Sequence, residues 1–465
     1  MGELKASGWA SVPVAEELRR NAIDRIRNGD PVVATVLGYE DTVLPQLENA
    51  LLAGHDVIFL GERGQAKTRM IRGLTDLLDE WMPIVEGSEI NDDPYNPISA
   101  HARALVEEHG DATPIDWVHR DTRYGEKLAT PDTSIADLIG EVDPIKVAEG
   151  RYLSDELTLH YGLVPRTNRG IFALNELPDL SERIQVGLLN VLEERDVQIR
   201  GYKVRLPLDV MLFASANPED YTNRGRIITP LKDRFGSQIR THYPLDVETE
   251  MTIVLQEAVL PPADVMDVRV PEFMLEIVAE LSQQARQSNQ INQRSGVSVR
   301  LSVANHEAMV ANAVRRTLIS GGETAVPRVA DLGAIAATTG GKIEVEAFED
   351  GSEGRVIDAL VRSAVHTVFV DSVDPALHGP IVDAFEEGVT VDVGPDVGLE
   401  AYGELLSQVP ALQPAVDALL DGDEIDAGHP AVVASAIELV LEGLHLGKRL
   451  NKNVHGGAAQ YRGRS

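Results

Sequence analysis

The sequence predicts an α/β fold, in which a parallel sheet carries helices on both faces, followed by a helix-rich second half. Three apolar runs, 57–60, 171–174 and 208–216, have the length of strands that are buried on both faces. Helical apolar spacing follows the first two runs and dominates the chain beyond residue 244. Buried strands that alternate with amphipathic helices are typical of parallel sheets.

The segment after the first strand has the pattern of a phosphate-binding loop. It follows G-x-x-x-x-A-K-T, with the residues Gly61, Glu62, Arg63, Gly64, Gln65, Ala66, Lys67 and Thr68. In such loops the backbone N–H groups and the N-terminus of the next helix face phosphate groups. We therefore expect Lys67 to contact the outer phosphates of a nucleotide and Thr68 to hold Mg²⁺. The alternative is a glycine turn with an incidental Lys-Thr pair, which the order of strand, loop and helix disfavours.

The ends of the second and third strands carry groups suited to nucleotide hydrolysis. That reaction needs an oxygen ligand for Mg²⁺ and an acid that orients and deprotonates the attacking water. We expect Asn175 to offer an amide oxygen to the ion and Glu176 to be the base. Asn217 is expected to contact the γ-phosphate or the water. The alternatives are a strand end that meets solvent and, for Asn217 before Pro218, an ordinary turn residue.

Composition limits the classes of partner and site. The 465 residues suffice for about three domains, and a hydrophobic content of 43% is ample for their cores. The absence of cysteine excludes disulfides and thiolate sites. A formal net charge of −32 repels a polyphosphate backbone, so nucleic acid is not expected as the main partner. No apolar leader and no run of about 18 apolar residues is present, so we expect no membrane span and a cytoplasmic location.

The other elements of the first half are short or local. Residues 13–55 are expected to form helix, loop and helix, and an insertion over the nucleotide face is expected near 125–165. A helix at 177–195 is followed by a pattern of alternating residues that predicts a hairpin turning at Gly201–Tyr202.

The second half is expected to be helical and to end in a basic tail. Its predicted helices lie at 247–260, 271–287 and 300–320, and further helices between 355 and 450 are interrupted at 391–398. The basic residues of the tail are Lys448, Arg449, Lys452, Arg462 and Arg464. They are interpreted as a local DNA-binding patch or as a frayed, solvated terminus, and the second is expected because chain ends are usually disordered unless they are docked.

Five segments, in chain order, resemble subunit I of magnesium chelatase, an AAA+ ATPase, and its MoxR-like relatives. These segments are GERGQAKTRMIRGL, DLIGEVDPIKVAEG, LVPRTNRGIFALNELPDL, ASANPED and TPLKDRFG. The resemblance covers about residues 30–245. It implies a helical leader, an AAA+ nucleotide-binding α/β core, a helical lid and a helix-rich C-terminal region, with the respective bounds 1–35, 36–245, 246–372 and 373–465.

The resemblance also implies roles for single residues. Lys67 and Thr68 match the Walker A motif, Asn175 and Glu176 occupy Walker B, and Asn217 matches sensor 1. Arg234 resembles the arginine finger that is offered to a neighbour's ATP, and Arg300 resembles sensor 2. For Arg234 the alternative is a surface ion pair with Asp233 or Glu219, and for Arg300 it is a solvated helix start.

The resemblance further implies a ring-forming ATPase that uses ATP and Mg²⁺, expected as a hexamer, with a partner that carries a von Willebrand A domain. Two residues depart from the family pattern, because Ala66 replaces glycine and Asn175 replaces aspartate. The second departure predicts slow hydrolysis and an elevated Mg²⁺ requirement, since an amide holds the ion less strongly than a carboxylate.

Three functions remain open at this point. The first, which the motifs favour, is an ATP-driven motor of the magnesium-chelatase or MoxR kind. The second is a scaffold that binds ATP to assemble and hardly hydrolyses it. The third is a DNA-directed AAA+ transcription regulator, which is disfavoured by the net charge and by the absence of a GAFTGA loop.

Overall fold

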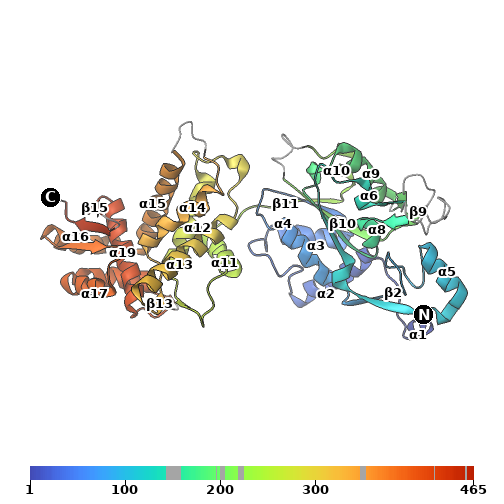
Figure 1. The fold of residues 1–465 in the computed structure, drawn as a ribbon, viewed down its shortest axis with the longest axis horizontal. Coiled ribbons are helices and arrows are strands. Elements are labelled where there is room, and N and C mark those ends of the chain that lie inside the picture. The colour runs from blue at the N-terminus through green and yellow to red at the C-terminus, as the bar shows by residue number, and fades with distance from the viewer. Residues whose placement is uncertain are drawn as a thin grey trace. The chain divides into compact units, whose positions relative to one another are not determined.

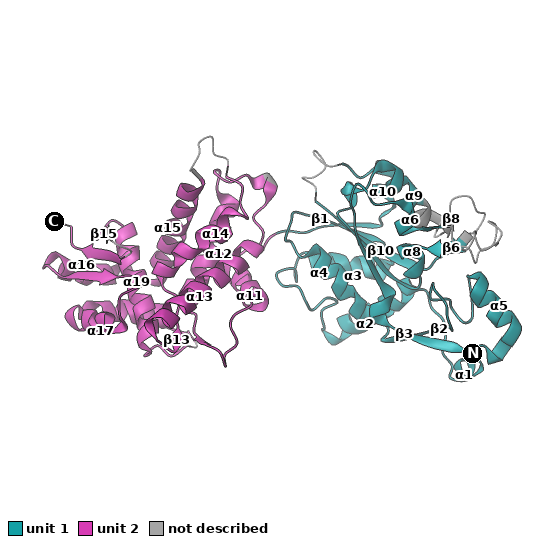
Figure 2. Cartoon of the chain, viewed as in Figure 1, with its two compact units in different colours: residues 1–242 teal, residues 243–465 magenta. Residues whose placement is uncertain are grey.

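The computed structural model describes residues 1–142, 159–194, 196–198, 205–217, 225–345, 352–423, 425–455 and 458–464. The chain divides into two compact units, Met1–His242 and Tyr243–Ser465 (Figures 1 and 2). The finer domain boundaries expected from the sequence stay predictions.

A five-stranded parallel sheet forms the centre of unit 1, with the strand order β11-β1-β10-β7-β4. Its strands are β1 (Val57–Leu60), β4 (Tyr124–Leu128), β7 (Gly170–Asn175), β10 (Val210–Ala216) and β11 (Ser237–Arg240). The three apolar runs predicted as strands are confirmed as β1, β7 and β10. The two edge strands are short and only partly buried, so they lack the continuous apolar pattern of a central strand.

Helices cover both faces of this sheet, as the sequence predicts (Figure 1). Neighbouring residues of a strand point to opposite faces, so that Phe59 and Phe213 belong to one hydrophobic cluster while Ile58 and Leu212 belong to another. The first cluster contains α2 (Val14–Asn28), α3 (Val43–Ala53) and α4 (Lys67–Gly73). The second contains α8 (Leu163–Arg166), α9 (Glu182–Glu194) and α10 (Thr229–Arg234).

Small elements complete unit 1. Besides α1 (Gly2–Ala6), α5 (Ala100–His109) and α6 (Ile135–Leu138), there are three antiparallel pairs: β2 (Trp81–Val85) with β3 (Ile115–His119), β5 (Gly140–Val142) with β6 (Leu159–Tyr161), and β8 (Asp196–Gln198) with β9 (Arg205–Pro207). The last pair confirms the predicted hairpin. Its expected turn at Gly201–Tyr202 lies outside the described residues.

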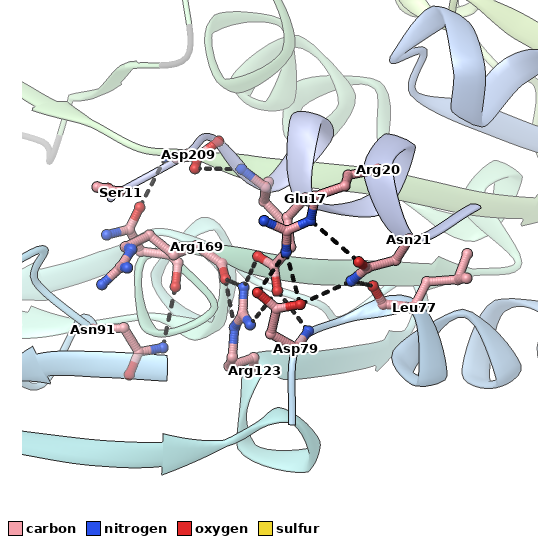
Figure 3. Close-up of polar contacts among 12 residues, drawn as sticks. Ser11, Glu17, Arg20, Asn21, Leu77, Asp79, Asn91, Arg123, Arg169 and Asp209 are labelled. Atoms are coloured by element: carbon pink, nitrogen blue, oxygen red, sulfur yellow. Dashed lines mark hydrogen bonds and ion pairs between the residues drawn. The ribbon is translucent and has the colours of Figure 1, made fainter. Parts of the chain in front are cut away.

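Buried polar groups tie α2 to the amino ends of the strands (Figure 3). We call Glu17, Arg123, Arg169 and Asp209 the amino-edge cluster. Arg123, directly before β4, donates to both carboxylate oxygens of Glu17 at 2.7 and 2.5 Å and to the carbonyl oxygen of Arg169. Asp209, directly before β10, accepts a hydrogen bond of 2.7 Å from the first N–H of α2. The residues that precede three neighbouring strands are therefore fixed to one another and to α2.

Unit 2 is helical, and one hydrophobic cluster extends from Phe273 to Tyr461. Its longer helices are α11 (Val247–Glu257), α12 (Glu272–Gln287), α13 (Arg300–Ser320), α15 (Ser352–Ser372), α16 (His378–Glu386), α17 (Leu399–Gln408), α18 (Gln413–Leu420) and α19 (Pro430–Leu446). The three helices predicted between 247 and 320 are confirmed as α11, α12 and α13. Within the described ranges, no helix has the length and apolar character needed to cross a membrane.

The expectation of a frayed C-terminal tail is wrong. Strands β15 (Asn451–His455) and β16 (Ala458–Arg462) form a hairpin, and β16 pairs with β14 (Thr390–Val393) at the predicted break in the helices. Tyr461 is 1% exposed, and Lys452 forms an ion pair of 2.7 Å with Glu442 of α19. The pairing is between segments about 70 residues apart, so local composition does not reveal it.

Candidate nucleotide-binding site

The carboxyl edge of the central sheet brings together the loop 61–68 and the strand-end residues Asn175, Glu176 and Asn217. Because the strands are parallel, Leu60, Asn175 and Ala216 end at the same edge. Strand β1 lies between β11 and β10. The next strand of this sheet along the chain is β4, which is the edge strand opposite β11. Such a reversal of strand order opens a crevice at the carboxyl ends, which is where ligands bind to open α/β sheets.

The loop from Gly61 to Thr68 connects β1 directly to α4. A Cβ at Gly61 would come within 1.9 Å of the Thr241 hydroxyl and 2.2 Å of the Gln65 side-chain oxygen, so glycine leaves room for the hydrogen bond between these two side chains. Gly64 and Ala66 both have positive φ, of 75° and 51°. Ala66 therefore takes the left-handed conformation in which glycine carries no steric penalty, and this explains why glycine is the usual residue there.

Lys67 folds back over this loop. Its ammonium group donates hydrogen bonds of 2.6 Å to the carbonyl oxygens of Gly61 and Glu62, and the residue is only 6% exposed. The loop thus holds a buried positive charge at the N-terminus of α4. This is the arrangement that the motif predicts for contact with the outer phosphates.

Thr68 and Asn175 bring two oxygen atoms together. The Thr68 hydroxyl donates to the Asn175 amide oxygen at 3.3 Å, and the Ser215 hydroxyl donates to the same oxygen at 3.2 Å. Adjacent ligands of an octahedral Mg²⁺ are about 2.9 Å apart, as follows from Mg–O distances of about 2.0 to 2.1 Å. The oxygens of Thr68 and Asn175 therefore fit the two protein ligands expected for the ion.

The amide nitrogen of Asn175 faces a charged group that the motifs did not indicate. It donates to Glu126 of β4 at 2.7 Å. Arg72 of α4 binds Glu126 with two hydrogen bonds of 2.8 and 2.9 Å, and Tyr124 adds a third of 2.9 Å. Burial pushes the pKa of Glu126 upward, but these hydrogen bonds and the charge of Arg72 outweigh it and lower the pKa below its usual value.

Glu176 and Asn217 stand at the ends of β7 and β10. Glu176 has a φ of 55°, in the left-handed region, and its N–H donates to the Ser215 hydroxyl at 3.3 Å. A non-glycine residue held in that conformation stores strain, which is frequent at functional sites. Asn217 is buried, directly after Ala216, whose carbonyl oxygen accepts from the N–H of Gly61. Both residues therefore lie at the sheet edge at which β1 leads into the loop, and their catalytic roles stay predictions.

The two predicted arginines lie in different units. Arg234 is exposed at the last residue of α10 in unit 1. Arg300 is exposed at the first residue of α13 in unit 2, where its N–H donates to the Ser298 hydroxyl at 3.2 Å. Their roles as arginine finger and sensor 2 stay predictions.

Tyr39 and Thr241 also escape detection from the sequence. The Tyr39 hydroxyl lies 2.9 Å from the carbonyl oxygen of Gln65 and 2.8 Å from that of His242, and the Thr241 hydroxyl donates to the Gln65 side chain at 2.7 Å. These contacts join the loop to the segment that follows β11. No local motif predicts these contacts, because the residues that they join are far apart in the sequence.

Comparison with known proteins adds relatives by sequence. A family model described as the Sigma-54 interaction domain matches residues 149–234. The magnesium-chelatase 38 kDa subunit of Rhodobacter capsulatus is 28% identical over 234 residues, which cover 48% of this chain and 59% of that protein. The magnesium-chelatase subunit ChlI-2 of Arabidopsis thaliana is 28% identical over 255 residues, covering 51% and 55%. The chain thus spans little more than half the length of these relatives.

Two solved structures are similar at lower identity. A cryo-EM-based complex between subunits BchI and BchD of magnesium chelatase shows 20% identity with a TM-score of 0.35, covering 71% of this chain and 98% of that chain. NtrX from Brucella abortus in complex with ADP shows 15% identity with a TM-score of 0.36, covering 80% and 67%. At these scores the superpositions add nothing to the fold, which follows from the strand order itself. By sequence, about half of the chain is homologous to the AAA+ ATPase subunit I of magnesium chelatase.

Proposed function

We propose that the protein is a ring-forming motor that hydrolyses ATP with Mg²⁺ and uses the energy to remodel or activate a partner protein. The observation that carries the proposal is the meeting of Lys67, Thr68, Asn175 and Glu176 at one edge of the sheet. Phosphoryl transfer depends on positioning and on stabilisation of charge, so it needs a cation, oxygen ligands for Mg²⁺ and a base at one place.

Each group has one role in this proposal. Lys67 binds the outer phosphates, while Thr68 and Asn175 hold the ion, which when bound neutralises charge on the phosphates. Glu176 orients the attacking water and takes its proton. Asn217, at the neighbouring strand end, positions the water or the γ-phosphate.

A ring is proposed because of Arg234. The residue is exposed at the end of α10 and matches the motif position of an arginine finger, which supports this role. An arginine finger contributes about 10³ to 10⁵ in rate, so a shared site would couple hydrolysis to assembly. A partner with a von Willebrand A domain and the hexameric ring size belong to the same proposal.

The second candidate is an ATP-dependent assembly scaffold. Asn175 favours it, because an amide in place of a carboxylate weakens the hold on Mg²⁺. Steady-state phosphate release by wild type and Glu176→Gln, with and without a partner, separates the two candidates. The motor requires that Glu176→Gln binds ATP and loses turnover, whereas the scaffold requires that the two proteins are indistinguishable.

The central test is calorimetric titration of ATP into Lys67→Ala. We expect binding to be lost, because the backbone of the loop cannot replace that charge at the outer phosphates. Lys232→Ala, an exposed lysine of α10, is the matched control and should bind as the wild type does. Unchanged affinity in Lys67→Ala would refute ATP binding at this loop.

The shared site is tested by mixing two inactive variants. Arg234→Ala should bind ATP and fail to turn it over, and addition of Lys67→Ala should restore some turnover, since an intact loop and an intact finger then meet at one interface. Lys232→Ala again serves as the control. Absence of rescue, together with a monomer in ATP by light scattering, would contradict the ring.

A further inference from the structure

The orientation of the Asn175 amide is fixed by Glu126. The amide has a donor end and an acceptor end, and an ionised carboxylate accepts hydrogen bonds only. Glu126 therefore takes the NH₂ group, at 2.7 Å, and the oxygen is turned toward the hydroxyls of Thr68 and Ser215. With the amide reversed, its NH₂ group would lie where the ion is expected, and its oxygen would face the carboxylate of Glu126.

Glu126 is itself held in place from three sides. One oxygen accepts from Asn175 and from Arg72, and the other accepts from Arg72 and from Tyr124. In register, Glu126 lies beside Ala173 and Leu128 lies beside Asn175, so the carboxylate reaches toward the strand end from within β4. Its side chain is 22% exposed, which leaves few alternative conformations.

We propose that Glu126 is a positioning residue for the Mg²⁺ of the bound nucleotide, because it sets the Asn175 amide with its oxygen toward the ion. This rests on the proposed function, since it concerns the ion that accompanies ATP. The pairing also explains the departure at position 175. An aspartate there would place a second carboxylate against Glu126, and like charges at that distance disfavour each other. The amide of Asn175 therefore suits the carboxylate of Glu126 better than an aspartate would.

The test measures Mg²⁺ dependence rather than turnover. A fluorescent ATP analogue is titrated in EDTA and then at increasing Mg²⁺, for wild type, Glu126→Gln, Asn175→Asp and the double variant. Residues that orient a metal ligand typically change metal affinity by about 10- to 100-fold. We expect Glu126→Gln to raise the Mg²⁺ midpoint by about tenfold or more, with the affinity in EDTA changed less than about twofold.

Two further variants distinguish a positioning role of Glu126 from a general loss of structure. Asn175→Asp alone should not lower the midpoint, although a carboxylate ordinarily holds Mg²⁺ more strongly than an amide, because its carboxylate opposes that of Glu126. The double variant should bring the midpoint to the wild-type value or below it, since the glutamine at position 126 then donates to the new aspartate. Glu182→Gln, which removes an exposed carboxylate of α9, is the matched control and should not shift it.

The possible results separate the inference from the function it rests on. A wild type that binds no analogue with or without Mg²⁺ overturns both. Normal binding with a shift below about threefold in Glu126→Gln overturns the positioning role only. If Glu126→Gln does not fold, Asn175→Asp tests the inference instead. A lowered Mg²⁺ midpoint in that variant would show that an aspartate is tolerated beside Glu126, and it would overturn the positioning role.

Discussion

Two Arg–Glu pairs lie on opposite edges of the same sheet and differ in their surroundings. At the amino edge, the side chains of Arg123 and Glu17 are 1% and 7% exposed. At the carboxyl edge, those of Arg72 and Glu126 are 63% and 22% exposed. The buried pair is bonded to main-chain groups, whereas Glu126 is bonded to the amide of a proposed Mg²⁺ ligand.

The different surroundings suit the two pairs to different tasks. Loss of one partner from a buried pair leaves an unpaired charge in a place without water, which is costly. A half-exposed pair is solvated after the loss and contributes little to stability. The amino-edge cluster is therefore expected to contribute to the stability of unit 1. The pair of Arg72 and Glu126 is expected to contribute little to stability and to act at the proposed Mg²⁺ site. Single substitutions test this contrast.

The largest effect is expected for Glu17→Gln. Removal of the carboxylate leaves the Arg123 guanidinium buried, and we expect a loss of about 3 to 5 kcal/mol in the free energy of unfolding of unit 1. Urea unfolding followed by tryptophan fluorescence measures it, because Trp9, Trp81 and Trp117 all lie in unit 1. Glu16→Gln, which removes an exposed carboxylate beside Arg19, is the control. Equal losses in the two variants would contradict the contrast.

The next effect concerns His306 of α13, a buried histidine. Neither ring nitrogen has a hydrogen-bond partner within the described part of the chain, and burial lowers the pKa of His306 to about 4, against a smaller effect of Glu307. The unfolded chain, with a pKa near 6.5, binds the proton first. Stability is therefore complete above about pH 6.5 and falls by about 3 kcal/mol as the pH drops to about 4.

Unfolding of the full chain followed by circular dichroism across this pH range measures the loss in unit 2. His306→Leu replaces the imidazole with an apolar side chain of similar size. It should flatten the pH dependence of the free energy of unfolding between pH 6.5 and 4. A slope that survives in His306→Leu would assign the acid sensitivity to other groups.

A smaller effect is expected for Ala66→Gly. The left-handed conformation costs alanine about 1 kcal/mol or slightly more, and the greater freedom of glycine in the unfolded chain offsets part of the relief. We expect unit 1 to gain about 0.5 kcal/mol. Tryptophan fluorescence during urea unfolding checks this gain. Destabilisation would mean that Ala66 makes a contact worth more than its strain.

The smallest change in stability is expected for Arg72→Met. The pair is half exposed, so its loss should cost only a few tenths of a kcal/mol. Because Arg72 holds both oxygens of Glu126, the same variant should raise the Mg²⁺ midpoint of ATP binding. A large loss of stability with an unchanged midpoint would make the carboxyl-edge pair structural, like its counterpart at the amino edge.

Local sequence patterns were sufficient to predict the elements that carry their own signatures. The apolar run at 57–60, the glycine loop and the helical spacing behind it lie within about 20 residues. The strands that end at Asn175 and at Ala216 each carry their own apolar run. The same holds for the predicted helices that became α11, α12 and α13. Spacing along the chain is enough for these, since each is fixed by which residues one element must bury.

The group that Asn175 faces is set by tertiary contacts alone. Glu126 belongs to a short edge strand with the mixed sequence YGEKL, and its meeting with Asn175 depends on parallel pairing between segments almost 50 residues apart. The tail hairpin is a second case, because β16 gains its order from β14 and from the buried carboxylate of Glu442. Sheet pairing is set by partners distant in the chain, so local propensity does not contain it.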